Sequence, residues 1–329
     1  MQHGSGDGVP GRVSRARVRG QLNTLTYVMQ GSLSQALSDR IPMEVFEEVI
    51  DRMDNPMLCR AAVVCTTWHP RATYNLYLSI ELRTRKSFDL LVKQSLHSAR
   101  VKRLLATTHK LVASDKEIAN LRLQGNTRPN TRFVHALPLV FGRAMPQLRA
   151  LEIRGDLPPS AHPTFKKFFL ALSQFRALTS LSLRNFRLNN FAQLRWIVGA
   201  FASLEELTLS NGSLHLLQDA DAIDSRPSVA LQSDLRLLRL DVDMKNGMQT
   251  FETVVDWFVS SAICRSLRDL KVWWPNDHSV EVTTEAIDRL LKAAGPSLTQ
   301  FCEVTHYAVG KWPRISVHTI QRPTSCVHP

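Results

Sequence analysis

Residues 178–183 read Leu-Thr-Ser-Leu-Ser-Leu, with apolar residues at the first, fourth and sixth positions. This spacing recurs along the chain, and successive copies begin 26 to 32 residues apart. The alternation at the end of each copy predicts a short strand with one buried face. A single copy buries too little apolar surface, so the copies are expected to stack side by side. The other copies begin at Ile118, Leu148, Leu204, Leu235 and Leu267, with an incomplete copy at Leu298.

The segments between these copies show helical periodicity. Four of them place apolar side chains on one helical face: residues 165–172, 191–201, 254–258 and 287–294. Gly295-Pro296 predicts the end of the last helix. One strand and one return segment per repeat are typical of leucine-rich repeats. We therefore expect an α/β fold, an irregular leucine-rich-repeat solenoid over residues 118–306 with parallel strands on its concave side and helices on its convex side.

One position departs from the leucine-rich-repeat consensus. Many such repeats place a buried Asn shortly after the strand, but this chain has other residue types there. We therefore expect the hydrogen-bonded Asn ladder to be missing or replaced. The residues at this position are Asp156, Phe186, Gly212, Asp243 and Pro275.

Strand residues that alternate with the buried leucines are expected to form a partner-binding surface on the concave side. Arg154 and Arg184 would stand one strand apart, within reach of a common carboxylate or phosphate. Trp273 would supply an aromatic anchor. The residues predicted to bind a target protein are Arg122, Arg154, Arg184, Arg239, Lys271 and Trp273.

The N-terminal part has a different pattern, that of a small helical module over residues 37–80. Pro42 fits the first turn of a helix, and the apolar residues up to Met53 follow at helical spacing. Asn55-Pro56 predicts an N-cap and the start of a second helix that ends near Thr66 and buries Cys65. Helices this short bury little apolar surface, so the module is expected to need a partner.

The residues of this module resemble the F-box motif, and those that follow Trp68 resemble fungal F-box proteins in particular. The resemblance covers about one eighth of the chain. The alternative is an ordinary helical hairpin in which Trp68 anchors the core. The motif residues are Ile41, Pro42, Glu44, Val45, Phe46, Val49, Ile50, Val63, Val64, Cys65 and Trp68, with a closing aromatic at Tyr74 or Tyr77.

The resemblance implies a substrate receptor of an SCF-type cullin-RING ubiquitin ligase, located in the cytoplasm, the nucleus or both. The F-box would dock on a Skp-family adaptor and through it on a cullin and a RING subunit, while the repeats hold a target. Such a receptor is not an enzyme and needs no cofactor. The residues expected to dock on the adaptor, some of which must also pack the module internally, are Ile41, Pro42, Val45, Phe46, Ile50, Leu58 and Trp68.

Composition and motifs narrow the other function classes. The sequence contains no phosphate-binding loop, dinucleotide fingerprint, nucleophile elbow or zincin motif, so no catalytic site is expected. The five cysteines form no Cys-x-x-Cys pair, and Cys302 with His306 supplies only two of the four ligands a zinc site needs. We therefore expect reduced, buried thiols and no metal. No apolar run approaches the roughly 18 residues of a membrane span, so no membrane partner is expected.

Charge is distributed unevenly. Residues 81–147 hold 13 Lys and Arg against four Asp and Glu, although the whole chain has a net charge of only +12. This basic collar predicts an acidic or phosphorylated partner, or else is a solvated helix face. Nucleic acid is a disfavoured partner, because only Phe88 and Phe133 lie near these cations to stack on bases. A repeat scaffold that joins no ligase is the other alternative.

The tails and loops of the chain, but not the linker between its two modules, are expected to lack regular structure. Residues 1–36 form a basic tail without the apolar core of a secretory signal, with a mitochondrial presequence as a minor alternative. Residues 81–117 are expected to be a basic helical linker or a first capping repeat. Residues 125–132 and 218–233 read as loops, and residues 307–329 as an irregular tail.

Overall fold

The computed structural model describes residues 40–114, 133–155, 165–188, 190–214, 234–241, 248–274, 280–305 and 314–319. The chain divides into two compact units, residues 1–46 and 47–329. The described part of the first unit is residues 40–46, which include the first residues of helix α2 (Met43–Asp51). The second unit contains every other element.

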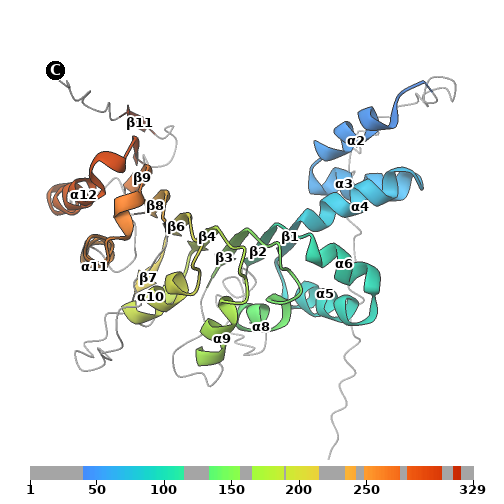
Figure 1. Ribbon diagram of the computed structural model, residues 1–329, viewed down its shortest axis with the longest axis horizontal. Coiled ribbons are helices and arrows are strands. Elements are labelled where there is room, and N and C mark those ends of the chain that lie inside the picture. The colour runs from blue at the N-terminus through green and yellow to red at the C-terminus, as the bar shows by residue number, and fades with distance from the viewer. Residues whose placement is uncertain are drawn as a thin grey trace, which may run out of the picture. The chain divides into compact units, whose positions relative to one another are not determined.

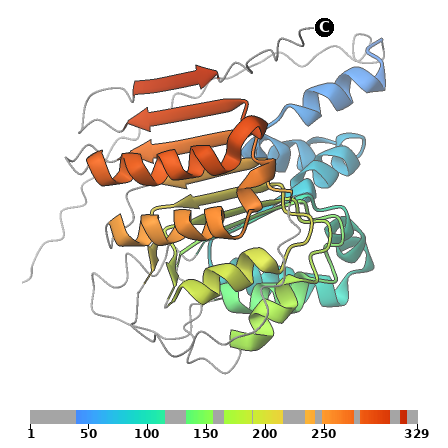
Figure 2. The ribbon, with the colours of Figure 1, turned by 60° about the vertical axis from the view of Figure 1, so that its left-hand side comes forward.

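The described part of the second unit contains a nine-stranded sheet (Figures 1 and 2). Its strands follow one another in chain order and are parallel, except that the last one pairs antiparallel with its neighbour. The expectation of an α/β fold with a parallel sheet is confirmed. The strands are β1 (Ser79–Leu82), β2 (Lys110–Ser114), β3 (Ala150–Arg154), β4 (Ser180–Arg184), β6 (Glu206–Ser210), β8 (Leu237–Asp241), β9 (Asp269–Trp274), β10 (Gln300–Thr305) and β11 (Arg314–Thr319).

Helices from α5 to α12 lie along one face of this sheet (Figures 1 and 2). The sequence periodicity located four of them correctly, since residues 165–172, 191–201, 254–258 and 287–294 fall on α9 to α12. The helices after α2 are α3 (Asn55–Val64), α4 (Trp68–Leu78), α5 (Arg85–His97), α6 (Ala99–Ala106), α8 (Leu137–Phe141), α9 (Phe165–Leu172), α10 (Phe191–Gly199), α11 (Met248–Ser260) and α12 (Val280–Ala294), with 3₁₀ turns η1 (Val134–Ala136), η2 (Ile263–Ser266) and η3 (Gly295–Ser297).

The main core lies between the sheet and these helices. In-register pairing of parallel strands places the repeat leucines in rows, such as Leu151, Leu181 and Leu207, and these side chains are almost fully buried. Apolar residues of the helices pack against the same rows. Burial of each leucine contributes about 2 kcal/mol before the entropy cost of ordering is subtracted. The six-residue pattern is therefore what joins sheet and helices.

The sheet begins earlier in the chain than the sequence indicated. The repeat copy beginning at Ile118 lies outside the described residues, and β2 occupies the place beside β3 that was expected for it. β1 pairs with β2 in the same parallel register. Segment 81–117 is thus not only a helical linker, because it completes β1 and contributes α5, α6 and β2. The strand β2 was not recognised in the sequence because it has only two core-facing residues, Leu111 and Ala113.

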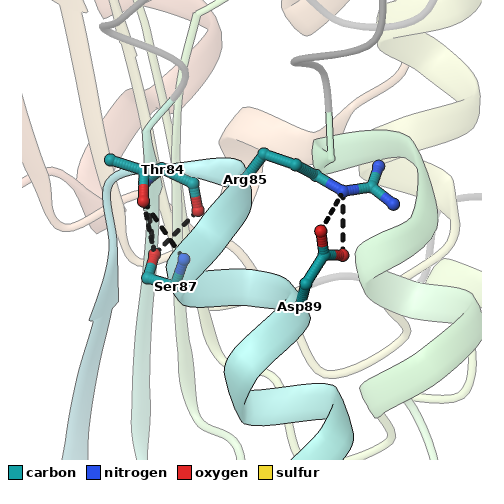
Figure 3. Close-up of polar contacts among 4 residues, drawn as sticks. All are labelled: Thr84, Arg85, Ser87 and Asp89. Atoms are coloured by element: carbon teal, nitrogen blue, oxygen red, sulfur yellow. Dashed lines mark hydrogen bonds and ion pairs between the residues drawn. The ribbon is translucent and has the colours of Figure 1, made fainter.

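Helix α5 starts at a capping box (Figure 3). The backbone N–H of Ser87 donates to Thr84 Oγ1 over 3.1 Å, and the backbone N–H of Thr84 donates back to Ser87 Oγ over 3.2 Å. Arg85 pairs with Asp89 one turn later, with 2.9 Å between Nε and Oδ1 (Figure 3). The two capping-box bonds satisfy backbone N–H groups at the start of the helix.

Two asparagines form a hydrogen-bonded pair immediately after the strands, one residue before the position predicted to lack the Asn ladder. Asn185 and Asn211 follow β4 and β6, both adopt left-handed backbone angles, and Asn211 Nδ2 donates to Asn185 Oδ1. Phe186 and Gly212 come next, and the Phe186 ring fills the space beside Gly212. Neither asparagine is buried, so this pair is not the buried Asn ladder of the consensus, whose position is occupied by Phe186 and Gly212 here. The paired strands β5 (Arg187–Leu188) and β7 (Ser213–Leu214) follow.

Within the segment 307–329, expected to be irregular, the described residues 314–319 form a strand, and the other residues of the segment lie outside the described ranges. β11 pairs antiparallel with β10, with Cys302 opposite Val317. The predicted stop at Gly295 is confirmed, since α12 ends at Ala294 and Gly295 has a φ of 57°.

Candidate functional site

The second unit opens with a small helical module, residues 47–78, made of the end of α2 with α3 and α4. Its own buried core consists of only four side chains, Ile50, Leu58, Ala61 and Ala72. Half-buried Met53, Ala62, Trp68 and Leu76 pack around them. A core this small stabilises the module weakly by itself.

The module exposes several large apolar side chains to solvent. Val63 is 84% exposed and Met57 is 55% exposed, although both lie on α3. Val64 on α3 and Val49 on α2 are exposed as well. In the first unit, Met43 and Val45 are also exposed on α2. Exposed apolar residues gathered on one short module mark an interaction surface.

The structure divides the predicted adaptor-docking residues into two groups. Pro42 and Val45 are exposed, whereas Ile50 and Leu58 are buried in the core of the module. Ile41, Phe46 and Trp68 are half-buried.

The structure also corrects the predicted N-cap of α3, the predicted burial of Cys65 and the set of residues predicted to dock. The N-cap of α3 is Asp54 instead of Asn55, because its side chain accepts a hydrogen bond from Met57 N over 2.8 Å. Cys65 is exposed instead of buried, as is Cys59. The residues predicted from the sequence to dock on the adaptor did not include Val49, Met57, Val63 or Val64, all of which are exposed. Spacing alone did not separate them from core residues, because adjacent apolar residues of a short helix can both be buried, as Ile197 and Val198 are on α10.

An ion pair braces the module between the end of α2 and α4. Asp51 Oδ1 accepts hydrogen bonds from Arg71 Nε over 2.7 Å and from Asn75 Nδ2 over 2.8 Å. The hydrogen bond from Arg71, then that from Asn75, lowers the pKa of Asp51 from 3.8 to about 2. The brace therefore holds the carboxylate in its charged form.

We expect Asp51→Asn to lower the stability of the module by less than about 1 kcal/mol at pH 7, because solvent screens a pair this exposed. The folded pKa lies below the unfolded value, so the contribution is complete above pH 3.8 and disappears as the pH falls towards 2. Urea unfolding at pH 7 and pH 3 checks this. A difference between wild type and variant that does not shrink at pH 3 contradicts the assignment.

His69 connects the module to the helices of the sheet. Its Nδ1 donates to the carbonyl oxygen of Ala62 over 2.7 Å, near the end of α3. Its Nε2 accepts a hydrogen bond from Arg100 Nη2 of α6 over 2.7 Å. One imidazole thus satisfies a helix-end carbonyl and joins α4 to α6.

The second candidate surface is the open face of the sheet, which we define as the face away from α5 to α12. Strand register places Glu152, Ser182, Thr208, Arg239 and Lys271 in one row across it. The next row contains Arg154, Arg184, Ser210, Asp241 and Trp273. Except for Arg122, which lies outside the described residues, all residues predicted to bind a target stand in these two rows.

Arg154 and Arg184 stand one strand apart as predicted, but the protein itself supplies a common carboxylate. Arg154 Nε donates to Glu152 Oε1 over 2.7 Å, and Arg184 Nε lies 3.1 Å from the same oxygen. The Glu152 side chain is only 11% exposed. Both cations are therefore already occupied by an internal partner.

Arg239 and Lys271 are neighbours in register, and Trp273 follows in the next row. Within the part of the chain that the structure describes, neither cation has an ion pair, and the buried Nε of Arg239 has no hydrogen-bond acceptor. Asp269 stands on β9 with Lys271, so the open face carries charges of both signs. Adjacent like charges in register repel, and a carboxylate placed between them would relieve this.

Comparison with models of known protein families found no match, and neither did comparison with curated proteins. Among the described residues, no helix is both long and apolar enough to cross a membrane. In the same ranges, no three His, Cys, Asp or Glu side chains gather as a metal site would require. Cys302 is buried on the sheet, and His306 lies outside the described residues.

Proposed function

We propose that this chain is a substrate receptor of an SCF-type cullin-RING ubiquitin ligase, with the helical module docking on a Skp-family adaptor. The observation that carries the proposal is the number of large apolar side chains that the module leaves exposed, compared with its small core. It buries four side chains in its own core yet exposes Val49, Met57, Val63 and Val64. Such a module gains stability when a partner covers these side chains.

The burial pattern refines which residues dock. Ile50 and Leu58 give the module its shape, while Met57 and Val63 meet the adaptor. The F-box resemblance names the partner class, because it rests on Pro42, Trp68 and the apolar residues between them. Substitutions in the core and at the surface are therefore expected to fail for different reasons.

In this proposal the sheet and its helices form a leucine-rich-repeat solenoid that binds the target protein on the open face. Parallel strands in chain order with helices on one side support this architecture. Arg239 and Lys271 would accept an acidic side chain of the target, and Trp273 would pack beside it. Arg154 and Arg184 contribute less, because both already pair with Glu152, whose single charge offsets one of their two.

The receptor makes no covalent bond in this mechanism. It holds the target near a charged ubiquitin-conjugating enzyme and so raises the effective concentration of target lysines. This mechanism requires two binding surfaces on one chain and a connection between them. The hydrogen bonds of His69 with Ala62 and Arg100 provide that connection.

Co-purification with a Skp-family adaptor and a cullin tests this proposal. Wild type is expected to recover both proteins, and Met57→Glu/Val63→Glu is expected to weaken adaptor binding by about a hundredfold, because charge is placed in an apolar interface. The matched control is Leu90→Glu/Leu96→Glu, which alters two exposed leucines of α5 outside the module. It is expected to bind the adaptor as wild type does.

Failure of wild type to recover the adaptor would sink the ligase assignment. Recovery of the adaptor without a cullin would show a scaffold that joins no ligase. Equal loss of binding in the Met57/Val63 variant and the Leu90/Leu96 control would show that the α3 surface has no special role.

A further inference from the structure

A second group of exposed apolar residues lies on the helices, far from the sequence of the docking module. Leu139 and Val140 project from α8, Leu170 from α9 and Trp196 from α10. Leu170 is 73% exposed and Trp196 is 48% exposed. We call these four residues, together with Lys167 and Arg195, the outer patch.

The residues of the outer patch lie on three neighbouring helices. α8 packs beside α9, and α9 beside α10 (Figure 1). The rings of Phe169 and Trp196 meet edge to face, with 5.8 Å between their centroids. The indole is therefore held in place by the core, and its outer half faces solvent.

Every charge on these three helices is positive. α8, α9 and α10 contain no Asp or Glu, while α9 carries Lys166 and Lys167 and α10 carries Arg195. Lys167 and Arg195 are both exposed. The patch thus combines protruding apolar side chains with cations that have no acidic neighbour on their own helices.

The helices at the other end of the sheet, α11 and α12, differ from α8 to α10 in charge and in exposed apolar side chains. α11 and α12 carry Glu252, Asp256, Glu281, Glu285 and Asp288, and Asp256 pairs with Arg289 over 3.0 Å. Among the described residues of these two helices, no large apolar side chain is exposed. Exposed apolar surface and unbalanced positive charge therefore coincide on α8 to α10, where both point to the same kind of partner.

We propose that the outer patch docks an acidic amphipathic helix of a partner protein. The apolar face of such a helix would cover Leu139, Leu170 and Trp196, and its flanking carboxylates would meet Lys167 and Arg195. Half-packed apolar side chains around a tryptophan are typical of protein interfaces. A bilayer instead takes up whole side chains, and a nucleic acid gains little from exposed leucine.

Fluorescence anisotropy with the full chain and a synthetic helical peptide of leucine and glutamate tests the proposal. The peptide is expected to bind wild type, whereas a scrambled peptide of equal composition and a lysine-for-glutamate version are not. Leu170→Ser/Trp196→Ser and Lys167→Glu/Arg195→Glu are each expected to weaken binding by about tenfold or more, as loss of interface anchors does. No adaptor is needed, so this result is independent of ligase assembly.

Helix α5 supplies matched controls, because it also exposes two leucines and carries lysines. Leu90→Ser/Leu96→Ser and Lys86→Glu/Lys93→Glu make the same chemical changes and are expected to leave binding within about twofold of wild type. Leu170→Ser alone keeps the ring contact of Trp196 with Phe169. It is expected to weaken binding without changing the circular dichroism melting curve.

Three results would overturn the proposal. Equal weakening by the α9–α10 and α5 charge variants would show that only net charge matters. Equal binding of the scrambled peptide would show no helical recognition. Binding of wild type to phosphatidylserine-containing vesicles but not to the helical peptide, with loss in the Leu170→Ser variant, would assign the patch to a membrane surface.

Discussion

Gly212→Ala is expected to lower the free energy of unfolding by about 2–3 kcal/mol, because it overpacks a closed core. A Cβ added at Gly212 would lie 2.2 Å from the ring of Phe186, far inside contact distance. Phe186 is 1% exposed, so its ring has no open space into which it can move. Urea unfolding of the wild type and the variant measures the difference.

A double variant tests the cause of this loss. Phe186→Leu shortens the side chain that meets residue 212, so Gly212→Ala is expected to cost about 1 kcal/mol less in that background than in the wild type. Gly295→Ala is the backbone control. Its Cβ would meet nothing within 4 Å, but its φ of 57° is left-handed, so a cost of about 1 kcal/mol is expected. Strict additivity of the two substitutions at 186 and 212 would contradict the proposed clash.

Glu152→Gln is expected to lower the free energy of unfolding by about 2 kcal/mol, since it removes the charge that two guanidinium groups share. Arg154 and Arg184 stand opposite each other in register and would then repel without compensation. The comparison variant is Glu206→Gln on the same face. Glu206 accepts one hydrogen bond from Ser180 over 3.0 Å and is exposed, so its loss is expected to cost less than about 1 kcal/mol.

The same variant is expected to acquire an anion site. With the charge of residue 152 removed, the two guanidinium groups are uncompensated, and phosphate can bind both of them from the solvent side. Phosphate should therefore raise the melting temperature of Glu152→Gln more than that of wild type, with sodium chloride at equal ionic strength as the control. Equal shifts in both proteins would show that Arg154 and Arg184 do not act as a pair.

The recurring leucines were sufficient to predict the sheet and most of its helices. Leu151, Leu181 and Leu207 occupy one buried row because apolar alternation fixes which side of a strand faces the core. The same argument failed for β2, which has few core-facing apolar residues, and for β11, whose segment lacks the six-residue pattern. Their pairing was decided by neighbouring strands, which offer hydrogen bonds along a whole edge.

The candidate surfaces were only partly predictable. Strand alternation placed Arg154 and Arg184 on a common face, but it could not show that Glu152, two residues away, would accept hydrogen bonds from both. The outer patch was not recognised from the sequence, although helical spacing places Leu170 and Trp196 away from the apolar faces of residues 165–172 and 191–201. Only the structure shows that both side chains remain exposed.

The sequence by itself determined the repeat, the strand register and the helical module with its F-box resemblance, because these depend on the spacing of apolar residues along the chain. The tertiary structure decided which apolar residues remain exposed and which charges are already paired. Burial and ion pairing depend on neighbours that are distant in sequence, so Ile50 became core while Val63 became surface, and Glu152 became the partner of Arg184.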